Sequence, residues 1–204
     1  MSIPPAVEDH HRRATIFAEA ALGRRLAEVD TPTAKFGPER LNKRGFYGGA
    51  WVINWQRTTS DGAPFVDDFL FVKLDDRNGP YIIRRQFNCE YQAPKSRNVD
   101  SHGAKEIALA QARTYLREHP EAAGLRDYQP TNSKEAKLVV VEPTFSTDRA
   151  FGKRRPGRLS WQVYVEAAKT APKHAHEQSP ALLSIYVYVD VENRACLRIL
   201  AVRP

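Results

Sequence analysis

The sequence contains few cysteines and no long apolar run. Cys89 and Cys196 are the only cysteines among 204 residues, and neither belongs to a CxxC or a metal knuckle. We expect both to be ordinary strand residues, with a single bridge as the alternative. No stretch approaches the roughly 20 apolar residues of a membrane helix, and the first thirty residues lack a secretory signal. This predicts a cytoplasmic protein with no membrane partner, or an exported one if a signal peptide has been removed.

Motifs of common enzymes are missing as well. The chain has no GxSxG, HExxH, phosphate-binding loop or Rossmann fingerprint. His174 and His176 would share a face of a strand and could then bind a metal, but Pro172 and Pro180 predict a loop around them. We therefore expect no enzyme, no cofactor and no metal site. A small enzyme with a cavity on a curved sheet stays open, because its polar residues would come from strands distant in sequence.

The composition indicates a folded protein with a basic balance. Hydrophobic residues make up 42% of the chain and aromatic residues 10%, which is typical of a globular core rather than of a disordered tail. The formal net charge is +7. Long-range electrostatics then favour an acidic protein partner or a polyanion.

The first half predicts one helix followed by antiparallel strands. Residues 5–29 have the apolar spacing of an amphipathic helix, and residues 31–49, rich in Gly and Pro, predict a loop with at most a short strand. A strand follows in "AWVINWQRT". The segments "FLFVKL" and "YIIRRQF" flank the turn "DDRNG" and predict a β-hairpin.

The second half has the same order of elements. A helix is predicted from a capping Ser101 to just before Pro120, with a face formed by Ile107, Leu109, Ala110 and Leu116. Strands are then predicted in "AKLVVVEPTF" and "RLSWQVYVEAA", and a closing hairpin in "LLSIYVYVDVENRACLRILAV".

The two hairpins align with each other. Asn193 follows Asn78 by 115 residues, and Trp161 follows Trp51 by 110. At the first offset, Leu70, Val72, Leu74, Asp75 and Ile82 correspond to Ile185, Val187, Val189, Asp190 and Leu197. We therefore predict an α+β fold of two helix-on-antiparallel-sheet units in tandem, covering residues 1–100 and 101–204. Chance similarity between two alternating hairpins is the alternative.

The second half, and more loosely the first from Trp51 to Gly79, resembles a known family. A helix, a strand, "W-x-V-x-V" at Trp161 to Val165, and "Y-V-x-V-D-x-x-N" at Tyr186 to Asn193 are similar to PepSY and related propeptide domains. Arg194 stands where that family usually has Gly after the turn. The resemblance implies a cystatin-like fold for each unit, in which a helix lies across a curled antiparallel sheet. It also implies binding or inhibition of a partner rather than catalysis.

Two groups of residues are candidates for partner binding. If the apolar residues of the hairpins face the helices, period-two alternation places the intervening aromatic and charged residues on the opposite face. These are Phe69, Phe71, Lys73, Tyr164, Tyr186 and Tyr188. Tyrosines on an open sheet face suit partner recognition, whereas packing of the two sheets or a homodimer would make the same rings core residues.

The second group is a basic loop. Its residues Lys153, Arg154, Arg155 and Arg158 suit phosphate or carboxylate recognition. The leading hypothesis is a non-enzymatic protein-binding module, inhibitor-like or chaperone-like, that recognises an acidic partner and possibly neutralises a toxin. A nucleic-acid-associated basic protein is the alternative, although no DNA- or RNA-binding motif accompanies the loop.

Overall fold

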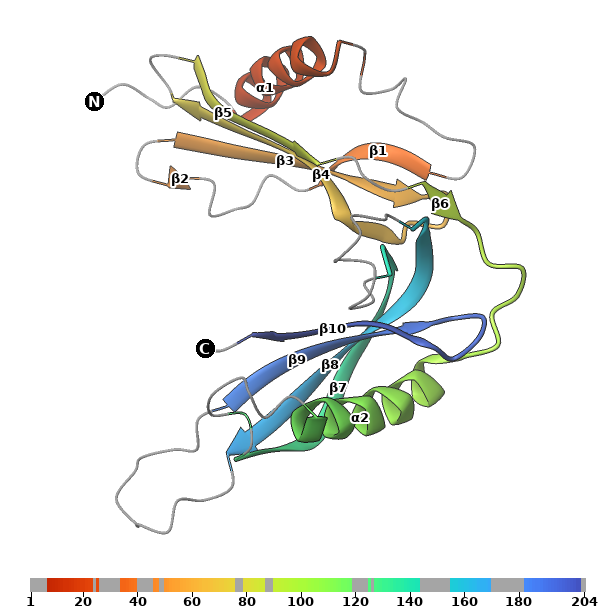
Figure 1. The fold of residues 1–204 in the computed structure, drawn as a ribbon. Coiled ribbons are helices and arrows are strands. Elements are labelled where there is room, and N and C mark those ends of the chain that lie inside the picture. The colour runs from red at the N-terminus through yellow and green to blue at the C-terminus, as the bar shows by residue number, and fades with distance from the viewer. Residues whose placement is uncertain are drawn as a thin grey trace, which may run out of the picture. The chain divides into compact units, whose positions relative to one another are not determined.

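The chain forms two compact units, residues 1–89 and 90–204, each combining a helix with an antiparallel sheet (Figure 1). The structure is a computed structural model. Each unit is α+β, as predicted, and is described by itself. The described residues are 7–23, 25, 34–39, 46–47, 50–75, 79–86, 90–118, 125, 127–143, 155–169 and 182–202.

The first unit is one helix followed by strands in sequence order. Its strands run in the order β1-β3-β4-β5, all antiparallel, with the short β2 beside β3. The predicted hairpin is present as β4 and β5. The predicted loop over residues 31–49 instead contains the strands β1 and β2. The elements are α1 (Val7–Leu22), β1 (Ala34–Glu39), β2 (Phe46–Tyr47), β3 (Ala50–Thr59), β4 (Pro64–Asp75) and β5 (Gly79–Gln86).

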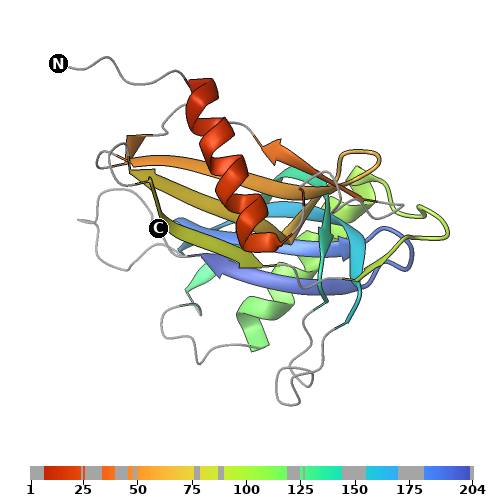
Figure 2. The ribbon, with the colours of Figure 1, turned by 90° about the horizontal axis from the view of Figure 1, so that it is seen from above.

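Small residues on α1 face its sheet. The helix contacts β3, β4 and β5 and crosses their strands (Figure 2). Ala14 and Ala18, one turn apart, are completely buried, as are Leu70 and Val72 on β4. Trp55 on β3 is also buried. The alanines lack bulk beyond Cβ, so the helix backbone can approach the strands closely.

A charged pair is buried at the β3–β4 hairpin of this unit. Nη1 of Arg57 lies 2.8 Å from Oδ2 of Asp68, whose side chain is completely buried. The guanidinium carbon of Arg57 also lies 4.1 Å from the centre of the Phe65 ring. Both charges are thus compensated within the hairpin, which is the condition for burying them.

The second unit also combines one helix with an antiparallel sheet. Its sheet runs β7-β8-β9-β10, antiparallel throughout, and β6 adds a short parallel pairing with β8. The predicted helix and closing hairpin are present, whereas β7 begins well before the predicted Ala136. The elements are β6 (Tyr91–Gln92), α2 (Ser101–Glu118), β7 (Tyr128–Val141), β8 (Gly157–Lys169), β9 (Leu182–Asp190) and β10 (Cys196–Val202).

The core of the second unit lies between α2 and one face of the sheet. The buried stripe of α2 is Ala104, Ala108, Ala112 and Leu116. The prediction placed Ile107, Leu109 and Ala110 on this face, but the first two are partly buried and Ala110 is exposed. Large residues are the usual signal of a core face, and here alanines occupy it because the helix packs closely. Val163, Val165, Ile185 and Val187 pack below them.

Asp100, rather than the predicted Ser101, caps the start of α2. Oδ1 of Asp100 accepts a hydrogen bond from the backbone N–H of Gly103, at 2.8 Å. This is the N-cap geometry, in which a short polar side chain satisfies a backbone N–H of the first turn. Ser101 is the first helical residue and is exposed.

The segment before α2 belongs to the second unit. The backbone N–H groups of Asn98 and Val99 donate to the carbonyl of Val191, at 2.8 and 3.0 Å. Nε1 of Trp161 donates to the carbonyl of Val99, at 2.8 Å. These bonds join the segment before α2 to the rest of the second unit, which begins at Glu90.

The turn between β9 and β10 places Arg194 in a backbone conformation that glycine adopts more readily. Oδ1 of Asp190 accepts hydrogen bonds from the backbone N–H groups of Glu192 and Asn193, at 2.7 and 3.2 Å. Arg194 then adopts a φ of 65°, the left-handed region that glycine adopts without strain. A glycine at this position is therefore what the turn geometry favours.

No helix in the described part of the chain has both the length and the apolarity that crossing a membrane requires.

Candidate functional site

The second unit's sheet has two chemically different faces. The odd-numbered residues from Trp161 to Ala167 on β8 and from Leu183 to Val189 on β9 are apolar and pack with α2 in the core. Even-numbered residues point to the other side, because successive side chains of a strand alternate. We call this side the tyrosine face. On these two strands it comprises Gln162, Tyr164, Glu166, Ser184, Tyr186 and Tyr188.

The strand register determines which residues lie next to one another across this face. Tyr164 pairs with Tyr186, and Tyr186 in turn pairs with Leu200 of β10. The adjacent row contains Glu166, Ser184 and Val202. The tyrosine face is therefore an ordered surface, in which each row joins residues distant in sequence.

Tyr164 and Tyr186 form an aromatic pair. Their ring centres are 5.5 Å apart and the ring planes are tilted by 47°, within the range of favourable aromatic contacts. The Tyr164 hydroxyl lies 3.2 Å from Oγ of Ser184, and either oxygen can donate this hydrogen bond. Both tyrosines are partly exposed. The pair thus presents rings held in place by their neighbours.

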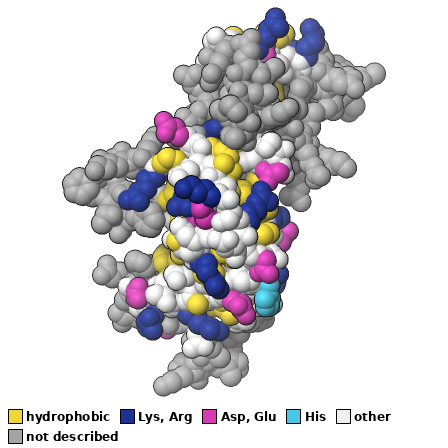
Figure 3. Space-filling view, turned by 90° about the vertical axis from the view of Figure 1, so that its right-hand side faces the viewer, with side chains coloured by type: hydrophobic (Ala, Val, Ile, Leu, Met, Phe, Trp, Pro, Cys, Tyr) yellow, Lys and Arg dark blue, Asp and Glu magenta, His cyan; other side chains and the backbone are white. Residues whose placement is uncertain are grey.

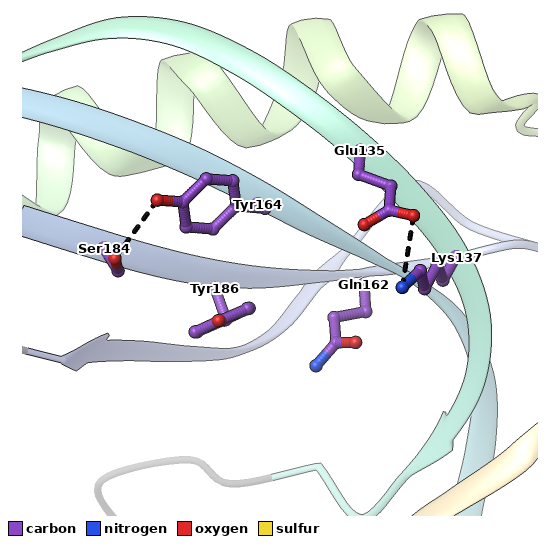
Figure 4. Close-up of a pocket in the computed structure, with 6 residues that line it drawn as sticks. All are labelled: Glu135, Lys137, Gln162, Tyr164, Ser184 and Tyr186. Atoms are coloured by element: carbon purple, nitrogen blue, oxygen red, sulfur yellow. Dashed lines mark hydrogen bonds and ion pairs between the residues drawn. The ribbon is translucent and has the colours of Figure 1, made fainter. Parts of the chain in front are cut away.

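A pocket of about 550 Å³ opens beside this pair. Its lining residues come from three strands, and Figure 4 shows Tyr186 and Gln162 pointing away from α2 into the open side. Nζ of Lys137 lies 3.1 Å from Oε1 of Glu135 at the border of the pocket. The lining therefore offers aromatic surface, amide and hydroxyl groups and both signs of charge. It comprises Glu135, Lys137, Gln162, Tyr164, Ser184 and Tyr186.

A second ion pair lies next to the tyrosines. Nζ of Lys134 donates a hydrogen bond to Oε1 of Glu166, and this bond raises the pKa of Lys134 above its ordinary value. A raised lysine pKa means that the ammonium group stays charged throughout the neutral range. Charges on this part of the tyrosine face are therefore balanced at neutral pH.

Tyr188 lies on the same face but is buried, with 3% of its surface exposed. Nε2 of Gln162 donates to its hydroxyl oxygen at 2.8 Å, and the guanidinium carbon of Arg198 lies 5.8 Å from its ring centre. Its ring is therefore held inside the protein, whereas Tyr164 and Tyr186 are accessible.

Arg158 is engaged by carboxylates of its own unit. Its Nε lies 2.8 Å from Oδ2 of Asp190, which is almost completely buried, and its Nη2 lies 3.5 Å from Oε2 of Glu192. The Arg158 side chain is 27% exposed. Its guanidinium joins the start of β8 to the turn that follows β9.

The structure describes only some of the other residues that the sequence analysis singled out. Arg155 is exposed just before β8. Phe69, Phe71 and Lys73 lie on β4, but the structure describes their backbone and not their side chains. Outside the described residues lie Lys153, Arg154, His174, His176 and Cys89. The roles predicted for the residues outside the described ranges stay predictions.

Four of the six residues that line the pocket were not predicted from the sequence as site residues. Gln162 and Ser184 have the same strand parity as Tyr164 and Tyr186, so alternation could have found them. Lys137 lies at the second position of the predicted strand and Glu135 just before it, but neither gave a signal of which residues of another strand would lie beside it. Their place beside the pocket results from the pairing of β7 with β8.

Cys196 is an ordinary strand residue, as predicted. It is a free thiol on β10 that packs against the core of the second unit. Burial raises the pKa of this thiol, which keeps it protonated and unreactive at neutral pH. Among the described residues, no group of three or more His, Cys, Asp or Glu side chains could hold a metal ion.

Comparison with known proteins gives a weak structural likeness. A scan against family models finds no match, and a search of curated proteins finds none. Among solved structures, the chain is similar to the "Bacillus megaterium YpeB C-terminal domain", with a TM-score of 0.38 and 7% identity. That alignment covers 100% of this chain and 68% of the other. A likeness at this level carries no conclusion about function.

Replacing Arg158 tests whether this residue supports the fold. Arg158→Ala should lower the free energy of unfolding by roughly 2–4 kcal/mol, because it leaves the buried Asp190 carboxylate without its cation. Urea unfolding would measure the loss. Arg113→Ala, on the exposed side of α2, is the control and should change stability by less than about 0.5 kcal/mol, as an exposed arginine does. Equal stability of both variants would contradict the structural role.

Proposed function

We propose that the protein is a non-enzymatic binding module that recognises a polypeptide partner through the tyrosine face of its second unit. The observation that carries this proposal is the accessible Tyr164–Tyr186 pair beside an open pocket. The partner is acidic, and the module acts in the manner of an inhibitor or chaperone, with toxin neutralisation as one form of this activity.

The chemistry of the face supports a polypeptide. Tyrosine provides a large contact area with few rotatable bonds, and it is enriched at protein interfaces. Gln162, Ser184 and the tyrosine hydroxyls offer hydrogen-bond groups that a peptide backbone can use. A closed cavity with a carboxylate and a histidine would favour an enzyme, and the lining described here has Glu135 but no histidine.

The charge distribution supports an acidic protein more than a nucleic acid. The net charge of +7 attracts an acidic partner over distance. Nucleic-acid binding needs several cations free to face phosphates, and Arg158 is already engaged by two carboxylates. Figure 3 shows one face, where basic side chains of described residues lie interspersed with acidic ones.

We further propose that the two units are tandem copies of one cystatin-like, PepSY-like module. The strand registers support this. Trp51, Ile53 and Trp55 pair with Leu74, Val72 and Leu70. Trp161, Val163 and Val165 pair with Val189, Val187 and Ile185. Every pair of the first set maps onto a pair of the second at the offsets that the sequence gives. In both units a helix precedes four antiparallel strands that pair in chain order, β1-β3-β4-β5 and β7-β8-β9-β10.

Crosslinking from the tyrosine face tests the proposed function. With the photoreactive residue p-benzoylphenylalanine in place of Tyr186, the protein should yield one discrete protein adduct in extracts of its native source. Arg113 on the exposed side of α2 is the control position and should yield none. Adducts with nucleic acid only, or the same adducts from both positions, would contradict the proposal.

The affinity for the captured partner then tests whether the Tyr186 side chain contributes to binding. Tyr186→Ala should weaken binding by about 10- to 100-fold, the range for an aromatic hot spot, as measured by titration calorimetry. The free energy of unfolding of the Tyr186→Ala variant should fall by less than about 1 kcal/mol, because the Tyr186 side chain is partly exposed. Arg113→Ala should change neither quantity. Unchanged affinity of Tyr186→Ala would exclude this face as the binding site.

The tandem proposal predicts equivalent roles for two tryptophans. Trp161→Ala should destabilise the second unit and Trp51→Ala the first, each by about 3 kcal/mol, because the tandem proposal assigns each tryptophan to the helix-facing side of its own sheet. Hydrogen exchange during urea unfolding would assign each loss to its own unit. A neutral Trp51→Ala together with a destabilising Trp161→Ala would show that the two hairpins are not equivalent.

A further inference from the structure

The strand β10 ends the sheet of the second unit. Among the described strands it pairs with β9 alone, so one edge of its backbone has no described strand beside it (Figure 1). Such an edge is a template for another strand, and proteins usually protect it with proline or several charges. The sequence of β10, CLRILAV, has no proline and one charge, Arg198.

Large apolar side chains are exposed beside this edge. Val202 on β10 is 49% exposed, and Leu182 at the start of β9 is 47% exposed. The register with β9 places Val202 beside Ser184 and Leu200 beside Tyr186, on the tyrosine face. Pairing of the edge would place a second strand beside Val202 and would satisfy the backbone groups along this edge of β10.

We propose that β10 pairs in antiparallel orientation with β10 of a second copy of this chain, about a two-fold axis at Leu200. The ladder with β9 is irregular between Cys196 and Arg198, so the regular part of the strand runs from Arg198 to Val202. Leu200 is the midpoint of that part. An isologous interface makes each residue face its counterpart across the axis.

This register avoids a clash of charges. Leu200 faces Leu200 of the second copy, and Arg198 faces Val202. A register centred on Arg198 would oppose two like charges, which is destabilising. With Leu200 at the centre, Val202 faces Arg198, whose guanidinium lies 5.8 Å from the Tyr188 ring centre of its own chain, so no like charges meet across the axis.

The dimer extends the tyrosine face. A two-fold axis perpendicular to the sheet keeps the same face on the same side, so the row Tyr164, Tyr186 and Leu200 continues into its symmetry mate. The dimer itself does not depend on what this face binds.

Five paired residues per copy give an interface smaller than those of permanent dimers, so we expect a dissociation constant on the order of 10 µM.

Cysteine crosslinking tests the register. In a Cys89→Ser, Cys196→Ala background, Leu200→Cys should form a disulfide-linked dimer under mild oxidation, because directly opposite residues have Cβ atoms about 4.5–5.5 Å apart. Val202→Cys is the matched control: it faces Arg198 and should crosslink at least tenfold more slowly. Equal crosslinking of the two variants, or none in either, would overturn the proposed pairing.

Sedimentation equilibrium of the otherwise unaltered protein tests the dimer. The weight-average mass should rise from monomer to dimer between about 1 and 500 µM, the span that the expected affinity requires. Leu200→Lys should keep the protein monomeric by placing two like charges at the axis, and Leu200→Thr should retain the dimer. Circular dichroism would verify that both variants fold. A protein that stays monomeric at every concentration would overturn the proposal, and would leave β10 to another partner.

Discussion

The alternation of side chains along β8 and β9 is the constraint on which the second unit depends. Val163, Val165, Ile185 and Val187 are completely buried against α2. Because side chains alternate with period two, burying these residues sends Tyr164 and Tyr186 to the opposite face. A register slip of one residue would put polar groups under the helix and is therefore strongly disfavoured. The accessible tyrosine pair is thus a direct consequence of how the core is built.

The tyrosine face divides into parts with different roles. At one end, the pair formed by Arg158 and Asp190 ties the start of β8 to the turn after β9, and Tyr188 is buried nearby. In the middle, Tyr164 and Tyr186 border the pocket. At the other end, Val202 lies on the unpaired edge of β10. The first end therefore contributes to the stability of the unit, and the surface available for binding lies in the middle and at the β10 edge.

The sequence predicted local features better than pairings between distant residues. Alternation placed Tyr164 and Tyr186 on one face and predicted the hairpin of β9 and β10. It did not reveal that Arg158 pairs with Asp190, because that contact depends on the folded sheet. The alanine stripe of α2 was missed because large residues such as Ile107 are the usual core signal. Asp100 caps the helix one residue earlier than predicted, a difference that depends on where the chain enters the first turn.

Chemical nitration of tyrosines is the most direct measure of whether this face is accessible. The protein would be treated with tetranitromethane and the modified residues located by peptide mass spectrometry. Tyr164 and Tyr186, which are partly exposed, should be nitrated well before Tyr188, which is 3% exposed. If Tyr188 reacts as fast as the other two, or if neither Tyr164 nor Tyr186 reacts, the tyrosine face is not the open surface that the account requires.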